Sequence, residues 1–167
     1  MRDDLDALQD RHNRGNRGMK RILMSACLAG LRVRYDGGTR RHASLSVLAE
    51  NAIIIPVCPE ILGGLGIPRP RCWFVGGDGE RVLAGQAQVV DENGVDKTEY
   101  LIHVAQAALQ ILKLTSPDLM IFKEVSPSCG LRRVDIQGNK VSGMGVTTAL
   151  LKASGIPILT EEDPLPW

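Results

Sequence analysis

The fold can be argued outward from the stretch Ala52-Ile53-Ile54-Ile55-Pro56-Val57-Cys58-Pro59-Glu60. Its first six residues form a short apolar run rich in β-branched side chains, which is typical of a buried strand. A thiol and a carboxylate follow, two positions apart, and the chain then enters the glycine-rich turn 62–66. The stretch therefore predicts a strand over 52–57 with Cys58 and Glu60 at its C-terminal end. In an open α/β sheet, ligands bind at that edge.

Two other apolar runs lead to a cysteine in the same way. The run 22–26 is followed by Cys27, and the run 119–123 leads to Ser126-Pro127-Ser128-Cys129-Gly130. If the three strands are parallel and adjacent, their thiols meet at one edge of the sheet. We therefore predict core strands over 20–26, 52–57 and 119–123, with a short final strand over 156–159.

Helical periodicity is clearest between 97 and 114, where apolar residues recur at spacings of three and four. Shorter helices are predicted over 45–49 and 147–153, an edge strand over 81–90 and a hairpin over 134–141. Strands that alternate with helices favour an α/β domain of three layers. The expected architecture is a mostly parallel sheet with helices on both faces, flavodoxin-like or Rossmann-like.

Composition excludes several kinds of partner. A chain of 167 residues with 44% hydrophobic residues can form one domain, which we place at 19–167. A net charge of +1 gives no reason to expect a nucleic-acid polymer or a membrane surface as partner. Residues 1–18 form a polar tail without the apolar core of a secretory signal, so a cytoplasmic location is expected. No feature of the sequence selects an oligomeric state.

The cysteines then carry most of the functional argument. In a reducing compartment they are expected as free thiols, metal ligands or catalytic groups rather than disulfides. No C-x-x-C pattern occurs, and cysteines are ordinary core residues, so spacing alone does not define a site. However, Cys27, Cys58 and Cys129 each follow an apolar run rather than lying within it. Three thiolates suit a soft metal, and a four-iron cluster held by only three would keep one iron open to a substrate.

Five segments together resemble the DUF523 family, which includes the thiouracil desulfurases. The resemblance extends from about residue 19 to residue 161. Its segments, in chain order, are Ser25-Ala26-Cys27-Leu28-Ala29-Gly30, Arg34-Tyr35-Asp36-Gly37, Cys58-Pro59-Glu60-Ile61-Leu62-Gly63-Gly64-Leu65, Pro68-Arg69 and Ser126-Pro127-Ser128-Cys129-Gly130.

The resemblance implies a desulfidase that converts C=S to C=O in a thiolated pyrimidine or a similar small thio-compound. It implies a [4Fe-4S] cluster held by Cys27, Cys58 and Cys129, whose fourth iron takes the substrate sulfur. Glu60 and Ser126 are the implied catalytic residues, with Ser126 preferred over Ser128. The candidates for substrate binding are Ser128, Tyr35, Asp36 and Arg69. Alternatives for the last three are packing for Tyr35, turn formation for Asp36 and an ion pair with a buried carboxylate for Arg69.

The chain departs from the family pattern in two places. Val33 stands where many relatives have a further cysteine, and Arg71-Cys72-Trp73 stands where proline and an acidic residue are common. We expect Cys72 to be a free thiol that lies apart from the other three. Two further hypotheses remain: a metal-free sulfurtransferase with a persulfide on a cysteine such as Cys129, and a zinc-stabilised binding module without catalytic activity.

Overall fold

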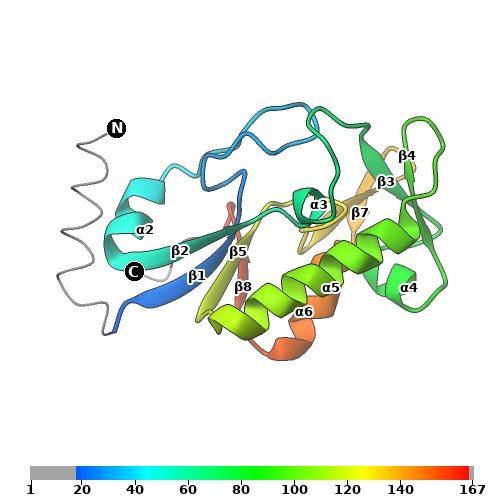
Figure 1. Cartoon of the computed structure of the whole chain (residues 1–167). Coiled ribbons are helices and arrows are strands. Elements are labelled where there is room, and N and C mark those ends of the chain that lie inside the picture. The colour runs from blue at the N-terminus through cyan, green and yellow to red at the C-terminus, as the bar shows by residue number, and fades with distance from the viewer. Residues whose placement is uncertain (1–17, 166–167) are drawn as a thin grey trace.

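The structure is a computed structural model that describes residues 18–165. The predicted polar tail therefore lies outside the described residues, apart from Gly18. Four parallel strands form the first sheet in the order β2-β1-β5-β8 (Figure 1). Their bounds are Lys20–Ser25 for β1, Ala52–Val57 for β2, Leu119–Phe122 for β5 and Ile158–Thr160 for β8. All four predicted core strands are present, with ends shifted by one or two residues.

Helices cover both faces of this sheet. Ile22 and Met24 of β1 point to the face covered by α2, Leu45–Asn51, whose Leu45 and Leu48 join the same apolar cluster. Leu23 points the other way, toward α5, Thr98–Thr115, and α6, Val146–Leu151. Alternate residues of a strand face opposite sides, so a strand covered on both sides must be apolar throughout. The predicted three-layer α/β fold with a parallel sheet is confirmed.

A second sheet stands beside the first and was not predicted. It has the order β4-β3-β6-β7, with β3 and β6 parallel and the outer pairs antiparallel. Its strands are Cys72–Val75 for β3, Gln88–Asp91 for β4, Arg133–Ile136 for β6 and Asn139–Ser142 for β7. The predicted hairpin corresponds to β6 and β7.

The predicted edge strand over 81–90 is wrong in its first half. A short helix, α4, spans Gly79–Leu83, and the strand begins only at Gln88. Asp78 is the physical reason, because its carboxylate accepts the backbone N–H of Arg81 and caps the helix. Two further short helices are α3, Pro59–Leu62, and the 3-10 helix η1, Lys152–Ser154.

Helix α5 connects the two sheets. Leu101, Val104 and Ala105 in its first half belong to the core of the second sheet, whereas Ala108 and Leu112 pack on the first. Figure 1 shows the helix running beneath both. The C-terminal ends of β1, β2 and β5 consequently face the second sheet. No helix between residues 18 and 165 has the length and apolar character required to cross a bilayer.

Candidate active site

A cavity of about 320 Å³ lies where the parallel sheet meets the second sheet. Cys27 follows β1, Cys58 follows β2, and Cys129 lies in the loop after β5; all three line the cavity. The parallel sheet thus brings together three thiols that are far apart in sequence. All three are free cysteines in the structure.

Burial keeps these thiols protonated. It raises the pKa of Cys27 to about 11, and the nearby Cys58 raises it further. Burial likewise raises the pKa of Cys58 and of Cys129, and Cys58 and Cys27 add to the effect at Cys129. These mutual effects show that the three sulfur atoms lie near one another. A metal bound here must displace the thiol protons, since only the thiolate is a ligand.

The thiols share a cavity without converging on one point. Among residues 18–165, no group of three or more His, Cys, Asp or Glu side chains is placed so that it could hold a metal ion. The arrangement is therefore not that of a preformed single-ion site, in which four ligands surround one zinc at about 2.0–2.3 Å.

Glu60 lies on the cavity wall and is paired with Arg69. The Arg69 Nε and Nη2 atoms lie 2.7 and 2.6 Å from Glu60 Oε2, and Nη1 donates to the Val33 carbonyl oxygen at 3.0 Å. The Glu60 and Arg69 side chains are only 16% and 6% exposed, so solvent screens this ion pair weakly. The structure thus shows the ion pair considered as the alternative for Arg69, while Arg69 also lines the cavity.

Tyr100 holds the backbone that carries Glu60. Its hydroxyl donates to the Glu60 carbonyl oxygen at 2.6 Å and accepts the Leu65 N–H at 2.9 Å. Pro59 opens α3 at a position where a helix needs no N–H donor. The short helix and the following turn are in this way fixed to α5.

The two serines of the Ser126-Pro127-Ser128-Cys129 motif differ in position. Ser126 lines the cavity, and its Oγ accepts the N–H groups of Ser128 at 3.2 Å and Cys129 at 3.0 Å. Ser128 is fully buried, shares a 3.1 Å hydrogen bond with Thr147 and is not part of the cavity wall. The proposed contact of Ser128 with substrate therefore has no support in the geometry.

Tyr35 and Asp36 also separate. Tyr35 lines the cavity, with the Arg34 guanidinium 5.2 Å from the centre of its ring. Asp36 is not on the wall: it pairs with Arg34 at 3.3 Å and accepts the Gly38 N–H at 2.9 Å. Asp36 is thus a turn residue, as the alternative reading held.

The cavity includes residues that the sequence did not indicate. Cys72 of β3 is part of the wall, so the expectation that it lies apart is wrong for the cavity as a whole. Charged side chains also line it, namely Arg34, Arg40, Arg71, Lys123, Lys140, Glu124 and Asp135. Lys123 and Glu124 could have been noticed, because they directly precede the serine motif. Arg71, which pairs with Asp135 at 2.7 Å, and Lys140 depend on the second sheet.

Fold and site together define an α/β protein with three reduced thiols and a paired carboxylate at the carboxyl edge of a parallel sheet. A family model described as 2-thiouracil desulfurase matches residues 22–163. The chain belongs to this family, and the membership predicted from its motifs is confirmed.

Two relatives illustrate the match. YbbK, an uncharacterized protein from Bacillus subtilis (strain 168), is 37% identical over 145 residues, covering 85% of this chain and 96% of YbbK. A solved structure of the [4Fe-4S]-dependent thiouracil desulfidase TudS (DUF523Vcz) is 36% identical. It superposes with a TM-score of 0.74 over 88% of this chain and 93% of its own.

Proposed function

We propose that this protein is a [4Fe-4S]-dependent desulfidase that replaces C=S by C=O in a thiolated pyrimidine or a similar small thio-compound. The observation that carries the proposal is that Cys27, Cys58 and Cys129 line one cavity together with Glu60 and Ser126. Family membership and the similarity to TudS support the reaction and the cofactor.

The residues present fit the cluster. Cys27, Cys58 and Cys129 would hold it, since they are soft sulfur donors on a common wall and are not arranged around a single ion. Three thiolates add negative charge, and the wall carries six basic side chains against three acidic ones. When bound, the cluster supplies a thiophilic iron without a protein thiolate, which takes the sulfur of the thiocarbonyl group.

Glu60 moves the protons in this proposal. Hydrolysis of C=S consumes one water and releases hydrogen sulfide, so a proton must leave the water that attacks the carbon. The Glu60 carboxylate accepts that proton as general base and returns it to a ring nitrogen or to the departing sulfur. Arg69 holds Oε2 in place, which leaves Oε1 for the water.

Ser126 and Tyr35 orient the substrate. Two backbone N–H groups occupy the acceptor side of Ser126 Oγ, so its O–H is the group left to donate toward a substrate in the cavity. Tyr35 presents an aromatic ring on the opposite part of the wall, which suits a planar heterocycle. At about 320 Å³ the cavity is near the lower limit for small-ligand sites, which favours a single-ring compound.

Anaerobic reconstitution tests the proposal. We expect a brown protein with about four iron and four sulfide per chain, the composition of one [4Fe-4S] cluster, and release of sulfide and uracil from thiouracil. Cys27→Ser, Cys58→Ser and Cys129→Ser should each lose the cluster, whereas Cys72→Ser should keep it. A colourless protein with cyanide-labile sulfur would indicate the sulfurtransferase instead, and one with stoichiometric zinc would indicate the binding module.

The structure disfavours the sulfurtransferase. A persulfide carrier uses a thiolate of lowered pKa that is exposed to its partner. Burial instead raises the pKa of Cys129, the cysteine considered for that role, which is only 5% exposed.

A further inference from the structure

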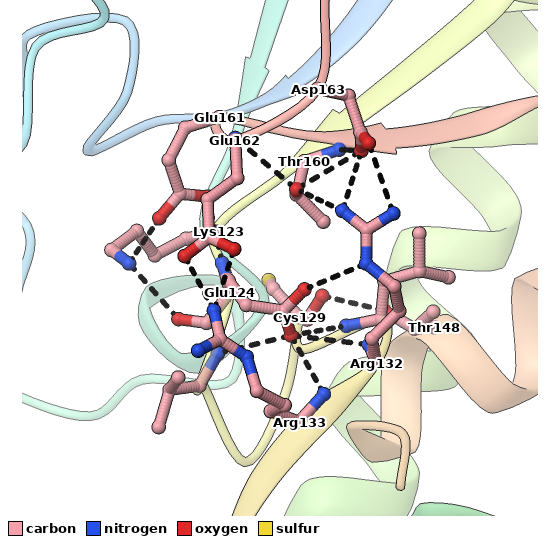
Figure 2. Close-up of polar contacts among 12 residues, drawn as sticks. Lys123, Glu124, Cys129, Arg132, Arg133, Thr148, Thr160, Glu161, Glu162 and Asp163 are labelled. Carbon is pink, nitrogen blue, oxygen red and sulfur yellow. Dashed lines mark hydrogen bonds and ion pairs between the residues drawn. The ribbon is translucent and has the colours of Figure 1, made fainter. Parts of the chain in front are cut away.

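A buried carboxylate next to the cysteine loop has no role in the proposed mechanism. Glu124 directly follows the Lys123 that ends the predicted third strand, and its side chain is 0% exposed. Its Oε1 atom accepts four backbone N–H groups, from Val125 at 3.3 Å, Leu131 and Arg132 at 3.1 Å, and Arg133 at 3.0 Å. Figure 2 shows these contacts converging on one oxygen. A buried charge is tolerated only when it is satisfied in this way.

The four donors lie at the two ends of one loop. Residue 125 precedes the segment 126–130, and residues 131–133 follow it; this segment carries Ser126 and Cys129. One oxygen atom therefore closes the loop. The closure has an energetic cost to offset, because Val125 has φ +57°, a region that a β-branched residue strongly disfavours.

The interior of the loop is held by other groups. The Thr148 hydroxyl donates to the Cys129 carbonyl oxygen at 2.8 Å, and the first amide of α6, on Val146, donates to the Pro127 carbonyl oxygen at 2.9 Å. Ser126 Oγ binds the loop from inside, as described above. Among these contacts only Glu124 connects the entry of the loop to its exit.

The C-terminal segment after β8 holds Glu124 in turn. Glu161 accepts the Glu124 N–H at 2.8 Å and pairs with Lys123. The Arg132 Nε atom lies 3.8 Å from Glu124 Oε2, which has no hydrogen-bond partner among the described residues. Asp163 fixes the same guanidinium through bonds of 2.9 and 2.8 Å (Figure 2).

We propose that Glu124 is a positioning residue that closes the 126–130 loop, so that Cys129 is already placed before a cluster binds and the bound cluster is retained. The inference rests on the proposed function, in which Cys129 is a cluster ligand. Residues that support a metal ligand from behind typically change metal affinity by about 10–100-fold when they are replaced.

Glu124→Gln is the first test, because it keeps the shape of the side chain and removes the charge. We expect the reconstituted variant to release iron to a ferrous chelator at least about 10-fold faster than wild type, without oxygen and well below the unfolding temperature. Glu162→Gln is the matched control, since it removes the same charge from an exposed ion pair with Arg133 nearby. Equal release rates for Glu124→Gln, Glu162→Gln and wild type would overturn the inference.

Hydrogen exchange on the metal-free protein provides a test that does not require the cluster. The amides of Leu131, Arg132 and Arg133 should exchange faster in Glu124→Gln, whereas those of β1 should not change. Faster exchange everywhere would show general destabilisation and would contradict a positioning role. If Glu124→Gln does not fold, Asp163→Asn, which frees Arg132, should show the same local effect.

The two proposals can therefore fail separately. A wild-type protein that takes up no iron would refute the desulfidase proposal, and the exchange data would still decide whether Glu124 closes the loop. A wild-type protein that holds a cluster, with unchanged amides and iron release in Glu124→Gln, would refute the positioning role alone.

Discussion

Glu60 shows how a residue can be located by sequence and still acquire an unexpected partner. Its position two residues after Cys58 predicted a carboxylate at the cavity, and the structure places it there. The ion pair with Arg69 joins two family motifs that are separated in the sequence. Arg69 therefore acts on the chemistry through Glu60 as well as through the cavity wall.

Glu60→Gln should separate cluster binding from turnover. The amide still accepts a hydrogen bond from Arg69, so we expect normal iron and sulfide content. Desulfurisation should fall by about 10²–10⁴-fold, because an amide cannot act as general base. The measurement is sulfide release per cluster, with the exposed Glu50→Gln as control. Near-normal turnover in Glu60→Gln would exclude Glu60 from the mechanism and shift attention to Ser126.

Asp163 provides a pH prediction at the same scale. Hydrogen bonds from Arg132 hold the pKa of this carboxyl below its ordinary value of 3.8. A lowered folded-state pKa means that the contribution of Asp163 is fully present above pH 3.8 and is lost as the pH falls through the lowered value.

Asp163→Asn should consequently lower the free energy of unfolding at pH 7 by about 1–2 kcal/mol, the usual range for hydrogen bonds to a charged group. The difference from wild type should shrink toward zero at pH 2–3, as measured by urea unfolding. A difference that is the same at both pH values would show that the charge of Asp163 is not what matters.

At the scale of elements, the start of α6 is pressed against the cysteine loop. Gly145 precedes this helix, and a Cβ at that position would lie 2.4 Å from the carbonyl carbon and oxygen of Ser128. The close approach allows the amides of α6 to reach the carbonyl groups of the loop. Glycine is required here for space, since its φ of −68° is open to any residue.

Gly145→Ala should therefore displace the helix or the loop. We expect a loss of about 1–3 kcal/mol in the free energy of unfolding, as for other overpacked sites, together with weaker cluster retention. Gly66→Ala is the control, because a Cβ there would lie 4.0 Å from the nearest atom. Unchanged stability and cluster content in Gly145→Ala would mean that the contact between α6 and the loop can relax without cost.

At the scale of the whole molecule, α5 makes the two sheets one structure. Its first half packs in the core of the second sheet and its second half on the first. The cavity also draws its walls from both sheets. We propose that the domain predicted over 19–167 is one cooperative unit.

Val89→Ala tests this unit, since Val89 is fully buried in the second sheet. The lost side-chain volume should cost about 2 kcal/mol. Hydrogen exchange should report the same loss at amides of Ile22 and Met120 in the first sheet as at Phe74 and Val134 in the second. A loss confined to the second sheet would indicate two units that unfold independently.

The sequence by itself determined the main elements and the cluster of motifs. Buried strands are short apolar runs and helices repeat every 3.6 residues, so local pattern was enough to locate β1, β2, β5, β8 and α5. The order of these strands then placed three separate cysteines at one edge, because the carboxyl ends of parallel strands share that edge. Fold class and family membership followed from the same residues and are confirmed.

Only the tertiary structure decided the rest. The strands of the second sheet are four residues each, too short to show a period, and the cap from Asp78 converted part of a predicted strand into α4. The contacts of Glu60 with Arg69 and of Glu124 with residues 131–133 join segments that no local pattern relates. The position of Cys72 on the cavity wall depends on how β3 packs beside the first sheet. Local sequence encodes the conformation of each segment, but the partner of a buried charge is settled only when distant segments meet and exclude water.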